Sequence, residues 1–130
     1  SLEAEGVRRK YARSKLEGLD WEAMRLNLER LLEEDRLFAR EGLTLAETAS
    51  MMDLSPHQMS ELGNVSYQKS FKAVLNEYRV RDARRALLAD PERDVTAIAF
   101  DSGFNSLSAF YRAMKGGYGQ SPGEIRAGDS

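Results

Sequence analysis

Residues 95–114 read VTAIAFDSGFNSLSAFYRAM, and this stretch decides the fold. Its apolar residues recur at spacings of three and four, which favours helices over strands. Gly103 interrupts the pattern once, and Phe104 follows it as an apolar plug for a tight turn. Ser106 then stands where a second helix would take its N-cap. The stretch therefore predicts a short helix, a tight turn and a second helix.

A weaker copy of the same pattern lies 50 residues earlier, where residues 45–62 read LAETASMMDLSPHQMSEL. Each copy has a small residue in its first helix, where a partner helix can cross closely, and a serine before its second helix. The matched pairs are Ala49 with Ala99, Leu54 with Phe104, and Ser55 with Ser106, the last at an offset of 51 because the second turn is one residue longer. At the same offset Met59 matches Phe110 and Leu62 matches Ala113, and these four residues are predicted to face inward. This is the layout of a helix-turn-helix unit, and we predict two of them, at about 44–63 and about 94–115.

A long helix is predicted between the two units, from about Lys69 to Leu88. It would span roughly 30 Å, and one turn of B-DNA is about 34 Å. A helix of that length can hold two recognition helices in successive major grooves of one duplex. Its inward candidates are Phe71, Val74, Leu75, Tyr78 and Ala86, and its outward candidates are Arg79, Arg81, Arg84 and Arg85.

The region before the first unit is predicted as a linker or basic arm over 1–19, with a helix near 7–15, followed by a helix from about Trp21 to Ala39 that Asp20 caps. An apolar stripe on the second helix either packs on the domain's own core or forms the seam of a homodimer. The stripe consists of Trp21, Met24, Leu28, Leu31 and Leu32. No stretch alternates as a strand would, so the predicted fold class is all-α, with two helix-turn-helix units, a long linking helix and an N-terminal helical extension.

The composition argues against several classes of protein. The chain lacks cysteine and has a single histidine, His57, which excludes disulfides, thiolate metal sites and multi-histidine sites. We therefore expect no metal, no cofactor, no catalytic residues and no enzyme. No apolar run approaches the roughly 20 residues that cross a bilayer, and the charged start has no signal-peptide core, so we expect a soluble, cytoplasmic protein. The first residue is Ser1 rather than methionine, which fits a piece of a longer protein.

The charge balance bears on nucleic-acid binding. The chain has 19 basic and 21 acidic residues, a net charge of −2. Between residues 44 and 126 the two signs balance, with ten residues of each. Because phosphate affinity depends on where cations cluster, we expect modest affinity for random DNA and a strong dependence on salt.

Several motifs together resemble the AraC/XylS family of bacterial transcription activators, over about Leu43 to Arg126. In order along the chain they are LAETA at 45–49, LSPH at 54–57, LNEYRV at 75–80, IAF at 98–100, GFNS at 103–106 and SP at 121–122. The resemblance implies that residues 20–130 form a DNA-binding domain and that the chain is a sequence-specific transcription regulator, an activator. Promoter DNA and RNA polymerase are the partners it implies, and a sensor domain is expected outside this chain. The YARS string at 11–14 resembles the linker of relatives whose sensors lie in the membrane, so a membrane-anchored full-length protein is an alternative.

The resemblance also assigns site residues. Base-reading positions of the family fall on His57, Ser60 and Glu61 in the first recognition helix, and on Leu107, Ser108, Tyr111 and Arg112 in the second. Arg112 can donate two hydrogen bonds to a guanine edge, whereas Glu61 either accepts from a cytosine amino group or only solubilises its helix. Candidate phosphate contacts are Ser55, Lys69, Lys72, Ser106 and Lys115.

The sequence departs from the family pattern at several positions. Gln68 stands where glycine is common, Gly63 where a large apolar residue is common, and Met114 where phenylalanine is usual. A glycine within a helix is unfavourable, so we expect the first recognition helix either to end early, near Gly63, or to be loosely anchored. Gly116 and Gly117 predict a flexible turn after the second recognition helix and a mobile second lobe. A helical protein-interaction adaptor that does not bind DNA is the main alternative, which an apolar outer stripe would favour.

Overall fold

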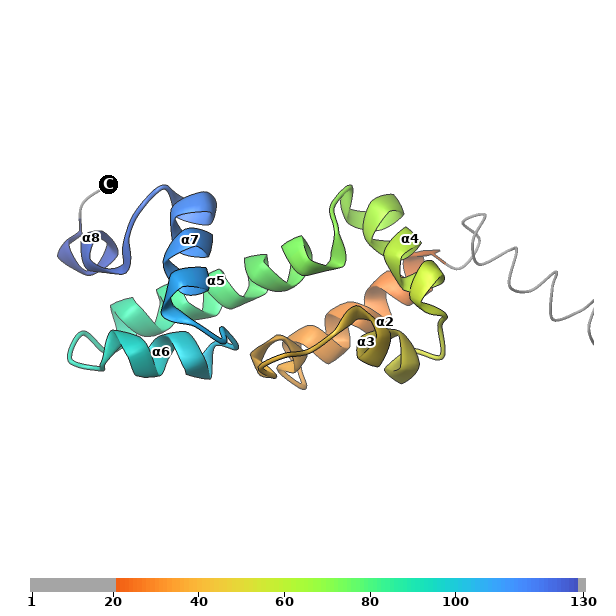
Figure 1. Cartoon of the computed structure of the whole chain (residues 1–130), viewed down its shortest axis with the longest axis horizontal. Coiled ribbons are helices and arrows are strands. Elements are labelled where there is room, and N and C mark those ends of the chain that lie inside the picture. Colours follow the sequence, from red (N-terminus) through yellow and green to blue (C-terminus); the bar gives the residue numbers. More distant parts are fainter. Residues whose placement is uncertain (1–20, 129–130) are drawn as a thin grey trace, which may run out of the picture. The chain divides into compact units, whose positions relative to one another are not determined.

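The structure, a computed structural model, describes residues 21–128, and all of their regular secondary structure is helical (Figure 1). The all-α prediction is therefore confirmed for this part of the chain. In order the elements are α2 (Trp21–Glu33), the 3₁₀ helix η1 (Leu37–Ala39), α3 (Leu45–Met51), α4 (Pro56–Tyr67), α5 (Phe71–Ala89), α6 (Val95–Asp101), α7 (Leu107–Tyr118) and α8 (Pro122–Ala127). The predicted arm over 1–19, with its helix near 7–15 and the YARS string, and the Asp20 cap lie outside the described residues.

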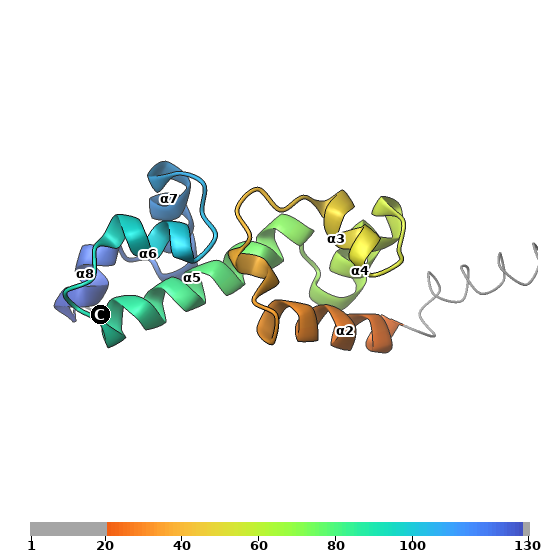
Figure 2. The same ribbon diagram turned by 90° about the horizontal axis from the view of Figure 1, so that it is seen from below.

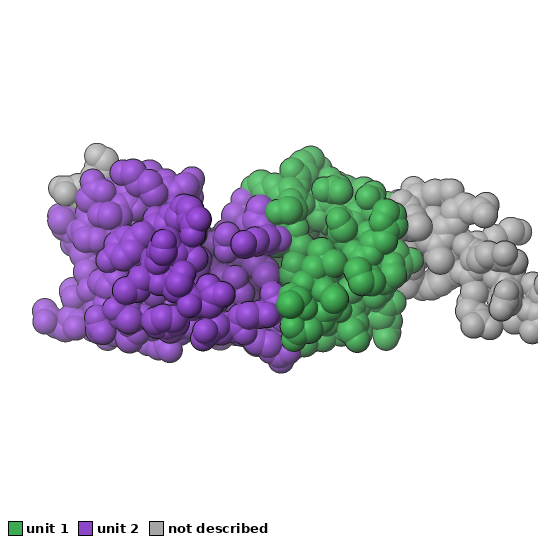
Figure 3. Space-filling model, viewed as in Figure 1, with its two compact units in different colours: residues 1–34, 44–71 green, residues 35–43, 72–130 purple. Residues whose placement is uncertain are grey.

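The chain divides into two compact units (Figure 3). The described residues of unit 1 are 21–34 and 44–71, and those of unit 2 are 35–43 and 72–128. Each unit therefore contains one of the two duplicated helix pairs, α3 with α4 in unit 1 and α6 with α7 in unit 2.

Unit 1 is built around α4, against which α2 and α3 both pack (Figure 2). Ala49 on α3 and Met59 on α4 are fully buried, as the repeat predicted. On α2 the apolar stripe is covered within the chain, since Trp21, Met24, Leu28 and Leu32 are all buried and Leu31 is partly buried. The stripe thus packs in the unit's own core, which was the first of its two interpretations.

The core of unit 2 joins α5, α6, α7 and α8, and α7 stands across α6 in Figure 1. Ala99 and Phe110 are fully buried, and the Phe104 and Phe110 rings meet edge to face with their centroids 5.3 Å apart. Arg126 on α8 donates hydrogen bonds to the carbonyl oxygens of Leu87 and Asp90, at 3.3 and 2.8 Å. These bonds satisfy carbonyl groups at the end of α5 that have no partner within the helix.

Arg79 contradicts its predicted outward position on the long helix. Its side chain is 9% exposed, and it donates to the Phe38 carbonyl oxygen at 2.7 Å and the Arg40 carbonyl oxygen at 3.2 Å. Burial lowers the pKa of this guanidinium from its ordinary value. The segment 35–43 supplies the acceptors, and nothing in the local helical pattern of α5 reveals them. Arg81, Arg84 and Arg85 are exposed, as predicted.

Three helix ends also differ from the predictions. The first helix ends at Glu33 rather than Ala39, because Arg36 takes a left-handed backbone conformation before η1. The first recognition helix does not stop at Gly63 but continues to Tyr67, with Gln68 as its left-handed C-cap. α7 likewise continues through Gly116 and Gly117 to Tyr118.

Contacts explain why two of these glycines are tolerated inside helices. A side chain at Gly63 would lie 2.8 Å from the Lys69 carbonyl oxygen, because the chain turns back there toward α5. A side chain at Gly117 would come within 3.3 Å of Val80 on α5. Both glycines therefore mark close approaches of the backbone to another segment rather than helix ends.

Candidate nucleic-acid interface

The start of α4 is fixed by a capping box. The Ser55 hydroxyl accepts from the Gln58 backbone N–H at 3.1 Å, and the Gln58 side chain accepts from the Ser55 backbone N–H at 2.9 Å. Pro56 at the first helical position suits the same geometry. The cap therefore fixes the backbone of the first turn of α4, which carries His57.

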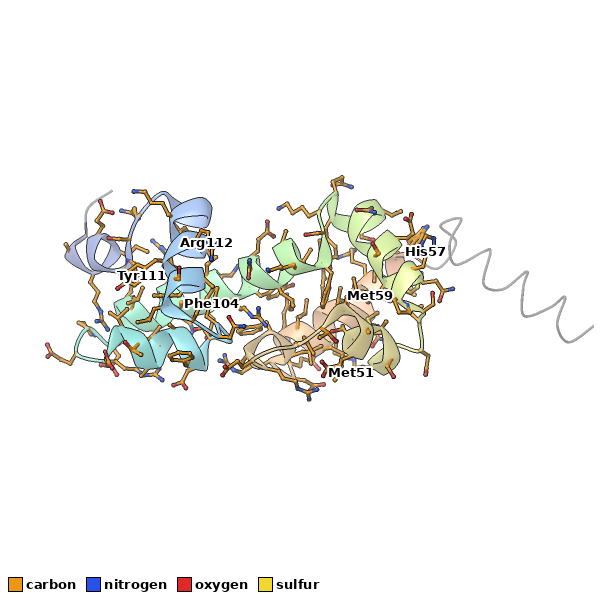
Figure 4. All side chains as sticks on the ribbon, in the orientation of Figure 1. Met51, His57, Met59, Phe104, Tyr111 and Arg112 are labelled. Carbon is orange, nitrogen blue, oxygen red and sulfur yellow. The ribbon has the colours of Figure 1, made fainter. Side chains whose placement is uncertain are left out.

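The outward face of α4 follows from what its other face buries. Met59 and Leu62 are fully buried, whereas His57 and Ser60 are exposed and Glu61 is partly exposed. Figure 4 labels His57 and Met59 on α4. Among the described residues, the Glu61 carboxylate has no hydrogen bond and no ion pair. The three candidate base-reading residues of α4 thus lie close together in sequence on the part of the helix that is not packed in the core.

The start of α7 is fixed in a similar way. The Ser106 hydroxyl accepts from the Ala109 backbone N–H at 3.1 Å. Phe110 and Met114 are fully buried, whereas Ala113, which the repeat placed inward, is only partly buried. Met114 is therefore the second buried residue that anchors α7, in place of Ala113.

All four candidate base-reading residues of α7 are exposed. Leu107 and Tyr111 are 37% and 46% exposed, and Ser108 and Arg112 are exposed as well. Figure 4 labels Tyr111 and Arg112 on α7. The Tyr111 ring rests edge to face on the buried Phe110 ring, with centroids 5.5 Å apart. Tyr111 therefore has one ring contact with the buried core while almost half of the residue remains exposed.

Arg112 differs from most arginines of the described chain. Arg85 and Arg93 pair with Asp82 and Asp101, and Arg84 lies over the Tyr118 ring. Arg112 makes no hydrogen bond, ion pair or ring contact with any residue from 21 to 128. Its five N–H donors are therefore available to an external acceptor.

The candidate phosphate contacts differ in their surroundings. Lys69 and Lys72 are exposed, as is Lys115, whose ammonium lies 4.0 Å from the Glu124 carboxylate. The pKa of Glu124 lies below its ordinary value chiefly because the Ser121 backbone N–H donates to it, so Lys115 is a secondary partner. Ser55 and Ser106 cap their helices, and Ser106 is partly buried.

Sequence reasoning missed one exposed cation. Arg40 follows η1, and its guanidinium has no partner among the described residues. It lies in an irregular segment without periodicity, so no sequence signal distinguished it from other surface arginines.

Two further observations on the described residues concern metal ions and membrane spans. Among residues 21–128, no group of three or more His, Cys, Asp or Glu side chains is placed to hold a metal ion. None of the helices between Trp21 and Ala127 combines the length and apolar character that crossing a bilayer requires.

Comparison with known families decides the identity of the fold. The family described as helix-turn-helix domain matches residues 48–128, which is most of the described chain. The chain belongs to the AraC-type helix-turn-helix family. This is a family of DNA-binding transcription regulators rather than of enzymes, and the AraC-type match includes both α4 and α7.

Two solved structures are similar to this AraC-type domain. One is a protein of unknown function from Listeria innocua, with a TM-score of 0.71 and 27% identity over 81% of this chain and 96% of that one. The other is the C-terminal domain of AraT, a response regulator from Geobacillus stearothermophilus, with a TM-score of 0.65 and 28% identity over 70% of this chain and 74% of that one. A comparison with curated proteins gave no significant match.

Proposed function

We propose that this AraC-type domain activates transcription by reading promoter DNA with two recognition helices, α4 and α7, in neighbouring major grooves. The exposed and unpaired side chain of Arg112 is the observation that supports the proposal most strongly. It is exposed on a helix that is anchored by two fully buried residues and capped at its start, and it has no partner among the described residues. A planar donor on a helix fixed in this way suits the two acceptors on the major-groove edge of guanine.

The other exposed residues of α7 complement Arg112. Leu107 is suited to an apolar contact with a thymine methyl group, and the Ser108 and Tyr111 hydroxyls can donate to or accept from base edges. In α4, His57 and Ser60 offer hydrogen bonds, and Glu61 can accept from a cytosine amino group. These contacts would specify sequence in two separate segments of the duplex.

Phosphate contacts would position the domain without reading sequence. We assign this role to Lys69, Lys72 and Lys115, and to Ser55 and Ser106 at the starts of the two recognition helices. Because the ligand is chromosomal DNA, we place the domain in the cytoplasm. RNA polymerase as a second partner follows from the activator role. A homodimer through α2 would need the face that carries Leu26, which is 54% exposed, because the apolar stripe is already buried.

One observation favours the alternative of a protein-interaction adaptor. Leu107 and Tyr111 are four residues apart on α7, so they form an exposed apolar pair of the kind that fits a protein groove. Arg112 and Lys115 lie on the same helix, however, and α7 contains no acidic residue. That charge pattern favours a polyanion as the ligand.

Selection of bound duplexes from a random pool tests the proposal. We expect enriched sequences with two specified segments about one helical turn apart, and an affinity whose logarithm falls steeply with the logarithm of salt concentration. A pool without enriched sequences, or binding that ignores salt, would contradict the proposal and favour the adaptor.

A further inference from the structure

Charge is distributed unevenly between the two units. The described residues of unit 1 include seven acidic and three basic side chains, a net charge of −4 with His57 neutral. Those of unit 2 include nine acidic and eleven basic side chains, a net charge of +2. At long range, the net charge therefore favours the approach of phosphates to unit 2 over unit 1.

The recognition helices show the same contrast at short range. α4 contains Glu61 and neither lysine nor arginine, whereas α7 contains Arg112 and Lys115 and no acidic residue. The two copies thus share the helix pair and its serine caps, whereas the charged residues of their recognition helices are opposite in sign.

The Glu61 carboxylate is not neutralised by a neighbour in the described chain. In the same unit, Glu22 and Glu29 both accept hydrogen bonds from Arg25, and that contact holds the pKa of Glu22 below its ordinary value. Glu61 has no such cation, and only His57, one helical turn earlier, is a helix-face neighbour that can carry positive charge. A duplex in contact with α4 therefore meets an uncompensated negative charge.

A carboxylate in a major groove is unfavourable next to phosphates and next to the acceptor atoms of guanine, and it is favourable only against a donor such as the cytosine amino group. We infer that Glu61 is a negative specificity determinant: α4 rejects sequences without a donor at one position, while unit 2 supplies most of the attraction to DNA. This inference rests on the proposed function, since it requires α4 to enter a groove. Glu61 would then add selectivity at one position of the segment that α4 reads, while α7 of unit 2 still reads its own segment.

The test compares the unaltered chain with Glu61→Gln and with Glu34→Gln, each on the selected duplex and on a random duplex of equal length. Glutamine keeps the size of the side chain and removes its charge. Glu34 is an exposed carboxylate of the same unit that follows α2 rather than lying on α4, so its variant controls for net charge. We expect Glu61→Gln to raise affinity for random DNA about tenfold, with a smaller gain or a loss on the selected duplex. Selection with this variant should also lose the cytosine preference at one position.

The outcomes separate the inference from the proposed function. An unchanged ratio of selected to random affinity in Glu61→Gln, or an equal change in Glu34→Gln, would overturn the inference while the unaltered chain still discriminates between duplexes. If the unaltered chain shows no preference for any duplex, the proposed function itself fails. Thermal unfolding of both variants, expected to match the unaltered chain, shows that the comparison is between folded proteins.

Discussion

Asp82 and Arg36 form a two-pronged ion pair within unit 2, in which the guanidinium nitrogens of Arg36 donate to the two carboxylate oxygens of Asp82 at 3.0 and 3.1 Å. The same carboxylate accepts from Arg85 at 2.9 Å and from the buried Ser102 hydroxyl at 3.0 Å. It thereby connects the segment 35–43, α5 and the end of α6. Asp82 is the central polar contact of this part of unit 2.

Asp82 should make the stability of the domain depend on pH. Burial alone would raise the pKa of this carboxyl, but hydrogen bonds from Arg36, Arg85 and Ser102 outweigh it and lower the pKa below its ordinary value. A carboxyl with a lowered pKa stabilises the fold above the unfolded-state value of about 3.9, and this contribution is lost as the pH falls through the folded-state value. Urea unfolding at a series of pH values from about 7 down to about 2 should show this loss, which begins below about pH 5.

The matching substitution is Asp82→Asn, which should lower the free energy of unfolding by about 2 kcal/mol at pH 7 and reduce its dependence on acid pH. Asp101→Asn is the control, because its ion pair with Arg93 lies on the surface and should contribute less than about 1 kcal/mol. An Asp82→Asn protein with the same acid sensitivity as the unaltered chain would show that the sensitivity comes from other groups.

Gly103 should tolerate no side chain. Its φ is +104°, and a methyl group there would overlap the Phe38 carbonyl oxygen and lie 2.8 Å from the Arg79 Nε. Gly103→Ala should therefore destabilise the domain by about 3 kcal/mol or more, measured by urea unfolding. Gly119 also has a positive φ, of +68°, but open space around it, so Gly119→Ala should cost only about 1 kcal/mol. Equal costs would mean that backbone strain, and not the close approach of segment 35–43, explains Gly103.

The glycines inside the two recognition helices should respond in opposite directions. Gly63→Ala places a methyl group 2.8 Å from the Lys69 carbonyl oxygen and should destabilise the domain by about 2 kcal/mol. Gly116 on α7 has nothing within 4 Å, so Gly116→Ala should stabilise the helix by up to about 1 kcal/mol. Thermal unfolding of the two single variants measures both effects, and a stabilising Gly63→Ala would show that the turn after α4 is loosely packed.

Much of the fold could be predicted because its signals are local. Ser55 and Ser106 are the caps that the repeat predicted, and Ala49 and Ala99 are buried as close helix crossings require. Arg79 could not be placed correctly, because its acceptor at Phe38 lies 41 residues earlier in a segment without periodicity. Gly63 was likewise misjudged as a helix end, since only the path of the chain at Lys69 explains it.

In the candidate site, too, some properties could be predicted from the sequence and others could not. Exposure of His57, Tyr111 and Arg112 followed from helical periodicity once Met59 and Phe110 were placed inward, and the structure shows all three exposed. The ion pairs and hydrogen bonds of the charged side chains could not be predicted, because they depend on which charged residues neighbouring helices bring close together. That Glu61 and Arg112 both lack partners in the described chain is visible only in three dimensions.

The most direct test of DNA reading through α7 compares Arg112→Ala with Lys72→Ala on the selected duplex and on random DNA. Arg112→Ala should cost about 1 to 3 kcal/mol on the selected duplex, change binding to random DNA little, and relax the preference at one base pair. Lys72→Ala should weaken binding to both duplexes alike and reduce the salt dependence by about one unit of slope. Equal losses on both duplexes for Arg112→Ala would contradict its role as a base-reading residue.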